Sequence, residues 1–388
     1  MQGKRTWAEI DLDALNYNVS EIKKHIKTGE FMAVVKADAY GHGAAVVAPY
    51  LEKLGINYFA VSNIEEAEEL RRAGVVGEIL ILGYTDVDLA IELFEQNIIQ
   101  SVFSLSYAKA LNAAAKKVGV KISVHLKIDS GMGRIGFNCR NEEIINSSSD
   151  EMAEVAKLSN LVVKGAFTHF SVADSEEPEN KQYTKMQYNN FLKGAESFKV
   201  KTGKNIILHC CNSAGTVLNT DMQLSLNRIG IIMYGLTPDV SLNLPLNLKP
   251  VMSFHTVISQ IKHISKGDFI SYGRTFKAEK DMVLATVPVG YADGFRRELS
   301  NKGYVLINGK KANIVGRICM DQAMVDITEI KADEGDNVTI FGKDLPVEQI
   351  ADWCHTINYE IVCGISRRVP RLYLKHGKIV RIENYIIG

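Results

Sequence analysis

A lysine followed by a loop of small residues is the first place where this sequence could do chemistry. Lys36 comes directly after the apolar run at residues 32–35, and the seven residues after it include two glycines and the aromatic Tyr40. At the end of a buried strand, a lysine can point its amine into the mouth of a barrel. A solvated side chain is the more common interpretation of such a lysine, so position alone leaves both open.

Other polar residues could move protons or bind an anion. Tyr272 and His169 are candidates for acid–base chemistry, although an unperturbed phenol has a pKa of about 10 and needs cationic or hydrogen-bonding help near neutrality. Taken alone, each is more commonly a structural residue. Asn212 and Ser213 stand at the start of a short helical stretch, where they could cap the helix, bind phosphate or do both.

The composition excludes several other classes of function. The 45 basic and 45 acidic residues cancel, which gives no support to a nucleic-acid or membrane-surface role. Six cysteines do not form a disulfide framework, and the nine histidines lack metal-binding spacing, so no metal site is predicted. The start has no apolar signal core, and no apolar run approaches the roughly 18 residues of a membrane span, so we expect a cytoplasmic protein.

The elements that must position these residues fall into two patterns. Up to residue 240, short apolar runs alternate with amphipathic stretches such as 64–73 and 87–96, which predicts βα units around a parallel sheet. About eight units in about 240 residues favour a closed (β/α)8 barrel, with an open doubly wound sheet as the alternative. The expected strands are 31–35, 58–61, 79–82, 101–103, 121–128, 161–169, 206–209 and 229–234.

After Pro250 the pattern changes to short β-branched segments separated by glycine or asparagine turns, which predicts a mostly antiparallel β domain. One short helix is expected near residues 346–355. We therefore expect a barrel over residues 1–240, whose first ten or so residues are free to pair with the second domain, and a C-terminal β domain over 241–388. The expected β segments are 253–264, 281–289, 304–317, 323–327 and 337–341.

Nine short motifs resemble those of the alanine racemase family and follow the family's order along nearly the whole chain. The resemblance implies a barrel followed by a β domain, pyridoxal 5'-phosphate as cofactor, and a homodimer with shared active sites. It also implies interconversion of L- and D-alanine by a two-base mechanism. The motifs are AVVKADAYGHG at 33–43, HLKIDSGMGRIG at 125–136, THFSVAD at 168–174, CNSAG at 211–215, NRIGIIMYG at 227–235, SYGRTF at 271–276, VPVGYADG at 287–294, GRICMDQ at 316–322 and RVPR at 368–371.

The same resemblance assigns the two bases. Lys36 becomes the lysine that binds the cofactor as a Schiff base and then serves as one base. Tyr272, contributed by the partner subunit, becomes the other, and a relay through His169 and Arg228 supports it. Arg228 is also implied to face the pyridine nitrogen; since an arginine stays charged, the ring would remain unprotonated and side reactions such as transamination would be limited.

Further residues are implied to bind the ligands. Arg134 resembles the arginine that contacts the substrate carboxylate, and Lys127 matches a lysine that is carbamylated in other members, where its negative charge could hold Arg134. The phosphate is expected near a group of polar and backbone donors: Tyr40, Asn212, Ser213, Gly230 and Ile231. The partner's loop around the substrate and a tyrosine at the cavity entrance are matched by Cys319, Met320, Asp321 and Tyr291.

One position departs from the family's pattern. Members commonly have a tyrosine before Arg-Val-Pro-Arg, near the phosphate and the substrate side chain, whereas this chain has Arg367. An arginine could still bind the phosphate, but it would change the pocket beside the substrate. Serine or a broader set of amino acids is therefore the alternative substrate, and a non-catalytic protein that binds pyridoxal phosphate is the alternative from another class.

Overall fold

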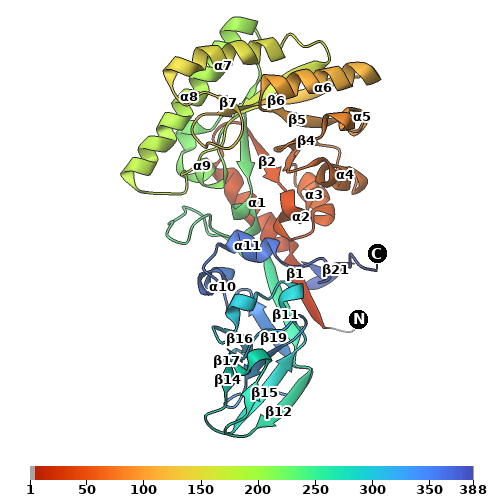
Figure 1. The fold of residues 1–388 in the computed structure, drawn as a ribbon, viewed down its shortest axis with the longest axis vertical. Helices are drawn as coiled ribbons and strands as arrows, with labels where there is room; N and C mark the ends of the chain where they lie inside the picture. Colours follow the sequence, from red (N-terminus) through yellow and green to blue (C-terminus); the bar gives the residue numbers. More distant parts are fainter. Residues whose placement is uncertain (1–4, 388) are drawn as a thin grey trace.

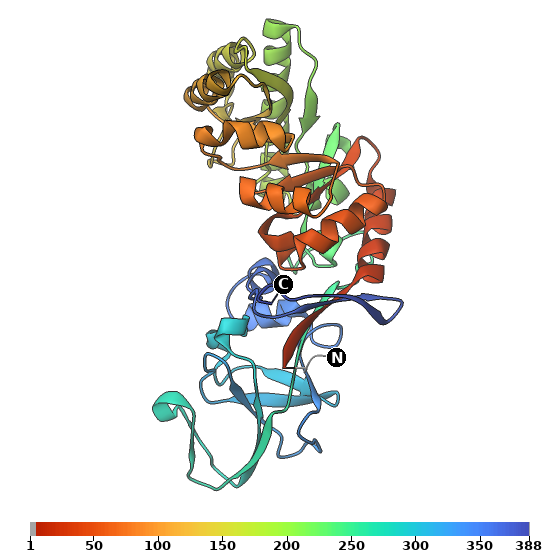
Figure 2. The same cartoon turned by 90° about the vertical axis from the view of Figure 1, so that its right-hand side faces the viewer.

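The computed structural model describes residues 5–387 and consists of two bodies stacked end to end. The upper body in Figure 1 is built from the red, yellow and green parts of the chain, and the lower body from the cyan and blue parts. Figure 2 shows that the N-terminal strand β1 runs alongside the C-terminal segments of the lower body. The first and last strands, β1 and β21, therefore lie close together near the junction of the bodies, with only β20 between them.

The upper body is a nearly closed barrel of eight parallel strands, which confirms the predicted fold class. The strands follow the order β10-β2-β3-β4-β5-β6-β8-β9, and β7 (Phe137–Asn138) pairs only with β6. Between the two ends of this order, Arg228 N donates to Cys211 O at 3.1 Å. The barrel strands are β2 (Glu30–Val34), β3 (Tyr58–Val61), β4 (Glu78–Ile81), β5 (Ile98–Val102), β6 (Ile122–Asp129), β8 (Leu161–Phe167), β9 (Ile207–His209) and β10 (Leu226–Ile229).

Helices surround these strands, and five of those described here begin at a residue whose side chain caps them. The side chain of Asn63 accepts a hydrogen bond from Glu66 N at the start of α4, and Ser104 caps α6 in the same way. The helices of this body are α1 (Leu12–His25), α2 (Lys36–Tyr40), α3 (Ala44–Lys53), α4 (Ile64–Arg72), α5 (Ala90–Glu95), α6 (Leu105–Val118), α7 (Glu142–Val155), α8 (Pro178–Thr202) and α9 (Ser213–Leu218).

The eighth strand lies elsewhere than predicted. We expected it at residues 229–234, but β10 ends at Ile229 and a 3₁₀ helix, Ile231–Tyr234, follows. All four residues of that helix are buried. A fully buried apolar run carries no periodicity that separates a strand from a buried helix, which explains the error.

The lower body is dominated by one ten-stranded sheet with the order β12-β15-β18-β17-β16-β19-β11-β1-β20-β21. Every strand pairing in it among the described residues is antiparallel except that of β1 with β20, so the mostly antiparallel prediction is confirmed. Its strands are β1 (Thr6–Asp11), β11 (Met252–Val257), β12 (Gln260–Ile264), β15 (Met282–Val287), β16 (Tyr304–Ile307), β17 (Lys310–Val315), β18 (Ala323–Asp326), β19 (Asn337–Phe341), β20 (Arg371–Lys375) and β21 (Lys378–Glu383); β13 (Phe269–Ile270) and β14 (Phe276–Lys277) form a separate hairpin.

Two α-helices interrupt the β domain within the described residues, where we expected one. The first, α10 (Val347–Trp353), lies within the predicted range, and α11 (Asn358–Cys363) follows it at the junction with the barrel (Figure 1). The strand β1 pairs with β11 and β20 although it precedes the barrel in sequence. Residues 1–4 of the expected N-terminal pairing lie outside the described residues, and the domain boundary at residue 240 stays a prediction.

A fully buried arginine ties the β domain to the barrel loop that follows Lys36. Arg371 is 0% exposed and donates to the carbonyl oxygens of four residues. One of these, Gly41 at 3.1 Å, belongs to the barrel, and the other three are Ser366 at 2.6 Å, Val369 at 2.6 Å and Ile365 at 2.8 Å. Buried carbonyl groups that lose their donors cost free energy, so this side chain stabilises both the loop and the junction.

We therefore expect Arg371→Met to lower the free energy of unfolding by about 3 kcal/mol or more, because four buried carbonyls lose their donors. Thermal unfolding measures the change. The matched control is Arg381→Met on the neighbouring strand, where the ion pair with Glu383 is exposed and its loss should cost about 0–1 kcal/mol. Equal losses in the two variants would contradict the role of Arg371.

Candidate active site

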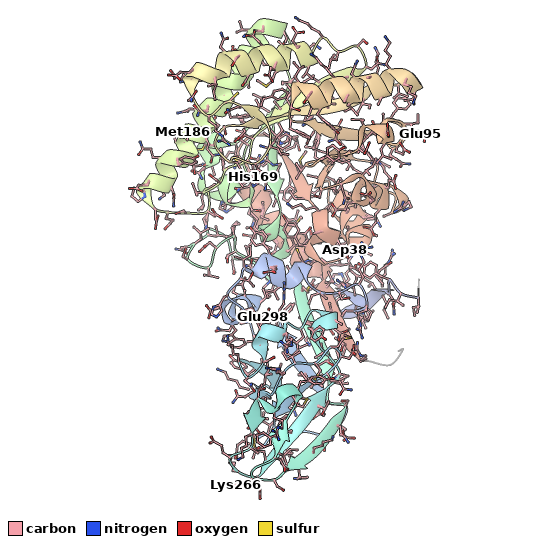
Figure 3. The ribbon with its side chains drawn as sticks, in the orientation of Figure 1. Asp38, Glu95, His169, Met186, Lys266 and Glu298 are labelled. Carbon is pink, nitrogen blue, oxygen red and sulfur yellow. The ribbon has the colours of Figure 1, made fainter. Side chains whose placement is uncertain are left out.

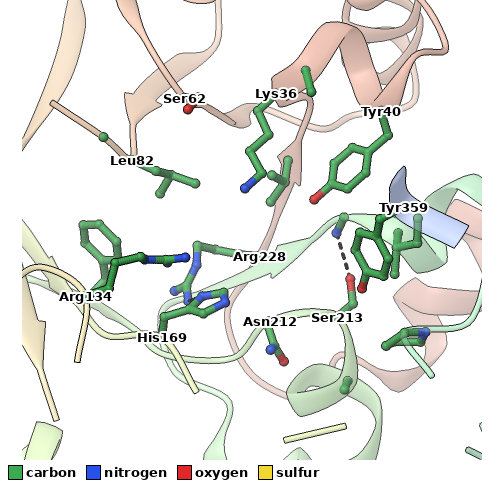
Figure 4. Close-up of a pocket in the computed structure, with 18 of the residues that line it drawn as sticks. Lys36, Tyr40, Ser62, Leu82, Arg134, His169, Asn212, Ser213, Arg228 and Tyr359 are labelled. Atoms are coloured by element: carbon green, nitrogen blue, oxygen red, sulfur yellow. Dashed lines mark hydrogen bonds between the residues drawn. The ribbon is translucent and has the colours of Figure 1, made fainter. Parts of the chain in front are cut away.

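A cavity of 530 Å³ opens at the carboxyl ends of the barrel strands. Figure 4 shows the amine of Lys36 pointing into it, with Arg134, Arg228 and His169 across the space. Polar lining residues come from β6, β10 and the loops after β2, β8 and β9. This face of a parallel barrel is where loops bring reactive groups together. The cavity contains these predicted site residues: Lys36, Tyr40, Lys127, Arg134, His169, Asn212, Ser213, Arg228, Gly230 and Ile231.

The backbone after Lys36 turns the opposite way from an ordinary helix. Four successive residues without a glycine among them, Ala37 to Tyr40, have φ between 52° and 55°. This left-handed conformation costs roughly 1–2 kcal/mol per residue, so neighbouring contacts must hold it. Glu66 accepts from Ala37 N at 2.7 Å, and Asp38 accepts from Ala44 N at 2.8 Å. The turn was not foreseen, because we expected β2 to reach Lys36 and it ends at Val34.

The cavity carries more positive than negative charge. Lys36, Lys127, Arg134 and Arg228 line it together with one carboxylate, Asp174. Burial, and next the charge of Arg134, lower the pKa of Lys36 from its usual value, so its amine loses a proton more readily than a surface lysine does. The excess of cations favours a ligand that carries a phosphate or a carboxylate.

Arg228 is held by four contacts at the base of the cavity. Its guanidinium donates to Thr168 O at 2.7 Å, to Cys210 O at 3.0 Å and to Nδ1 of His209 at 3.0 Å. A longer contact of 3.4 Å reaches Nδ1 of His169. Since a guanidinium only donates, both histidines present an unprotonated Nδ1 to it. Burial lowers the pKa of Arg228 to about 10, which leaves the group charged near neutrality.

Lys127 is buried with few polar partners. It is 3% exposed, its Nζ donates to Ile128 O at 3.1 Å, and the same atom lies 5.3 Å from the centre of the Phe167 ring. Burial, followed by the charge of Arg228, lowers its pKa to about 7. A substantial fraction of this amine is therefore neutral, and hence nucleophilic, near neutral pH.

A compact group of donors lies at the other end of the cavity. Ser213 accepts from Gly230 N at 2.9 Å, and Asn212 caps α9 through Gly215 N at 2.9 Å. A Cβ atom at Gly230 would lie 2.6 Å from the hydroxyl oxygen of Tyr40, so only glycine leaves this space free. The hydroxyls of Tyr40 and Ser213 and the backbone of Gly230 therefore border one small pocket that could bind a phosphate.

An aromatic residue in the cavity wall escaped the sequence analysis. Tyr359, on α11, lines the cavity, and its ring centre lies 5.9 Å from that of Tyr40. The helix had not been predicted, so nothing in the sequence alone pointed to this tyrosine.

Arg367 is not among the residues that line the cavity. It is exposed, and its guanidinium lies 3.3 Å from Glu69 and over the ring of Tyr385 at 5.0 Å. The structure therefore does not support the expected contact between Arg367 and a phosphate, because the guanidinium is already paired with the carboxylate of Glu69.

The remaining predicted site residues lie in the β domain, away from the cavity. Tyr272 begins a short 3₁₀ helix between β13 and β14 and is 69% exposed; Met320 is 52% and Tyr291 43% exposed. Tyr272 and Cys319 border a separate cleft of 480 Å³. In Figure 3 His169 lies in the barrel and Lys266, six residues before Tyr272, at the far tip of the β domain. Asp321 forms an ion pair with Arg368 at 2.8 Å.

Comparison with known proteins places this geometry in a family. The model of the alanine racemase N-terminal domain matches residues 10–238, and that of the C-terminal domain matches residues 251–373. This chain belongs to the alanine racemase family. Alanine racemase 1 of Clostridium acetobutylicum and the alanine racemase of Clostridium tetani are each 44% identical to it over 98% of both chains.

Solved structures of the family superpose closely on this chain. The alanine racemase of Clostridium difficile 630 has a TM-score of 0.94 at 41% identity, and each chain is covered completely. That of Bacillus anthracis, solved with bound L-Ala-P, has a TM-score of 0.93 at 36% identity over 100% of this chain and 99% of the other. The barrel cavity and the separate β-domain cleft thus belong to a family fold that covers the whole length of the chain.

Burial of Lys127 should make stability depend on pH. Its native pKa of about 7 lies below the unfolded value, so burying the cation costs most below pH 7 and less as pH rises towards the unfolded pKa. Lys127→Met should therefore stabilise cofactor-free protein more at about pH 6 than at about pH 9. Denaturant unfolding in buffer freed of carbon dioxide measures this.

The matched control is Lys121→Met, at an exposed position directly before β6. It should change stability alike at both pH values. A Lys127→Met effect that does not vary with pH would show that the lysine is not desolvated.

Proposed function

We propose that the protein is a pyridoxal-phosphate-dependent racemase that interconverts L- and D-alanine. The observation that carries the proposal is Lys36, whose amine enters a cation-lined cavity at the mouth of a barrel of this family. A cofactor with a phosphate matches the charge of that cavity. The structure of the Bacillus anthracis relative with L-Ala-P supports an alanine-derived ligand there.

The residues present fit such a cofactor. The pocket beside Gly230, bordered by Tyr40 and Ser213, would hold the phosphate, and Lys36 would hold the carbonyl carbon. Asn212 and Ile231 would border the phosphate, and Arg228 would face the ring nitrogen from the base of the cavity. When bound, pyridoxal phosphate withdraws electrons from the amino acid and makes its α proton acidic.

The chain's own groups would then move the proton. Lys36 suits one face of the substrate, because its lowered pKa increases the neutral fraction of the amine that can accept a proton. Arg228 keeps its charge and can only donate to the ring nitrogen, so the ring would stay unprotonated. That would favour return of the proton to the α carbon over side reactions.

A base for the opposite face would come from a second copy of the chain. Tyr272 is exposed at a site remote from its own barrel cavity, with Cys319 close by and Met320 exposed in the same loop. A homodimer in which each β domain covers the partner's cavity would bring Tyr272 to the substrate, with Tyr291 and Asp321 at the entrance. His169 presents its unprotonated Nδ1 to Arg228, so its Nε2 carries the hydrogen and could donate to the phenol oxygen.

Arg134 would bind and orient the substrate carboxylate, and Lys127 would hold Arg134 in place. The neutral amine of Lys127 can attack carbon dioxide to form a carbamate, whose carbonyl carbon becomes bonded to Nζ as a proton leaves. The product is an anion among cations, so it would be stabilised by Arg134 and Arg228. We infer that Lys127 is carbamylated in the working enzyme.

Alanine is favoured over serine because the relatives that match this chain over its length are alanine racemases. Arg367, the position that suggested a changed pocket, pairs with Glu69 outside the cavity. Serine stays the alternative substrate that the assay must exclude. The six cysteines are all free, which fits the reducing cytoplasm, where we propose that the enzyme supplies D-alanine. Among residues 5–387, no helix is long and apolar enough to cross a membrane.

Racemisation is tested directly with the cofactor-loaded protein. L-alanine should give D-alanine until the two are equal, and L-serine should react far more slowly. Lys36→Ala should lower kcat by at least about 10³-fold, while the exposed control Lys53→Ala should not. Borohydride reduction and peptide mapping should find the cofactor on Lys36. Cofactor bound without D-alanine formation would favour the non-catalytic alternative.

Subunit exchange tests the shared site. Lys36→Ala and Tyr272→Phe proteins should each be nearly inactive. After exchange in equal amounts, half of the dimers are mixed and each holds one intact site of two, so about a quarter of wild-type activity should return. Each variant exchanged with itself is the control. Verified exchange without recovery would place both bases in the same subunit or dismiss Tyr272.

A further inference from the structure

A buried histidine on β6 plays no part in the mechanism above. His125 is 1% exposed, and its Nδ1 lies 3.0 Å from Nε2 of His209. Nδ1 of His209 in turn lies 3.0 Å from a guanidinium nitrogen of Arg228. Side chains from β6, β9 and β10 thus form one hydrogen-bonded row, which runs from the cavity wall into the barrel interior.

The row has only one consistent arrangement of hydrogens when both imidazoles are neutral. Arg228 can only donate, so Nδ1 of His209 accepts and its Nε2 carries the hydrogen. That hydrogen points to His125, whose Nδ1 must therefore accept. His125 then carries its own hydrogen on Nε2, an atom that meets no hydrogen-bond partner among the described residues. The guanidinium thereby determines the tautomer of both histidines.

The barrel makes room for this histidine at a break in its strand pairing. The register between β6 and β8 shifts at Val124 and His125, and Lys164 is the extra residue on β8. Such a bulge redirects side chains and is common beside functional sites. Opposite the imidazole stands Gly165, where a Cβ atom would lie 2.6 Å from the ring. Two local features thus accommodate one imidazole.

Both imidazoles stay uncharged at working pH. Burial, and next the charge of Lys164, lower the pKa of His125 to about 3. Burial also lowers the pKa of His209, and the cations Arg228 and Lys127 lower it further. The row consequently provides a neutral acceptor for Arg228 rather than a counter-charge.

We propose that His125 is a positioning residue: its Nδ1 accepts from Nε2–H of His209 and so holds that ring in the orientation in which its own Nδ1 accepts from Arg228. The inference rests on the proposed function, in which Arg228 faces the cofactor ring and supports the second base. Without an acceptor at residue 125, the Nε2–H of His209 would be buried without its partner, which costs free energy. The imidazole would relieve that cost by rotating, and Arg228 would lose its acceptor.

The tautomers can be measured without turnover. In holoenzyme labelled with ¹⁵N-histidine, His209 and His125 should both carry hydrogen on Nε2 and none on Nδ1, unchanged between about pH 6 and 9. Single substitutions assign the signals. A hydrogen on Nδ1 of His209 would overturn the proposal, whether or not the protein racemises alanine. The predicted tautomers in a protein without racemase activity would refute the proposed function alone.

Two substitutions separate positioning from packing. His125→Gln offers an oxygen that can accept from His209, whereas His125→Leu has a similar size and no acceptor. The Leu variant should lose about 10-fold or more in kcat and change KM little, since neither histidine touches the substrate; the Gln variant should keep most of kcat. The Leu variant should also convert more cofactor to the aminated form per turnover.

The control is His355→Asn, at an exposed left-handed position that asparagine tolerates. It should leave both kinetic constants unchanged. Equal losses in the Gln and Leu variants, or wild-type kcat in the Leu variant, would overturn the proposal. If the Leu variant fails to fold, the tautomers of the wild-type protein and the kcat of the Gln variant still test the proposal.

Discussion

Positive charge buried with little negative charge beside it is the constraint on which the barrel depends. Each buried cation costs several kcal/mol of desolvation. Two lysines and two arginines line the cavity with a single carboxylate, and of these cations Lys127 and Arg228 are buried. Arg228 offsets this cost through hydrogen bonds to backbone carbonyls and to imidazoles that burial keeps neutral. Lys127 reduces the cost because its pKa falls to about 7, so that part of the amine is uncharged. An anionic ligand would relieve what remains, so binding of the cofactor and stability of the barrel are expected to be coupled.

A second constraint is the left-handed turn that follows Lys36. Its backbone would not hold this shape alone, and its anchors come from both bodies of the molecule. Glu66 and the turn's own Asp38 act within the barrel. From the β domain, Arg371 donates to Gly41 O and Tyr373 donates to His42 O at 3.0 Å. The direction of the Lys36 amine is therefore a property of the whole chain and not of the barrel alone.

The sequence alone predicted the elements whose signals, periodicity and helix caps, are local. The predicted strands 58–61 and 337–341 match β3 and β19, and α4 begins where Asn63 caps it. The sequence did not predict elements whose structure depends on tertiary packing. The apolar run after Ile229 forms a buried 3₁₀ helix where we expected a strand, and α11 has no side-chain cap by which its start could have been predicted. Tyr359 was missed for that reason. Arg367 was expected near the phosphate because it directly precedes the RVPR motif. Its side chain instead pairs with Glu69, nearly 300 residues away in the sequence.

That motif links the two halves of the proposed site. Arg371, at its end, binds Gly41 in the loop after Lys36, while Arg368, at its start, pairs with Asp321 in the β-domain loop that also contains Cys319. Arg368 also lies 3.2 Å from the buried Asp293, which Arg5 pairs with at 2.9 Å. In the proposed dimer, these two loops would serve different active sites. One segment of four residues therefore contacts both the loop after one subunit's lysine and the loop that this subunit would lend its partner, so the geometry of the two sites would depend on the same hydrogen bonds and ion pairs.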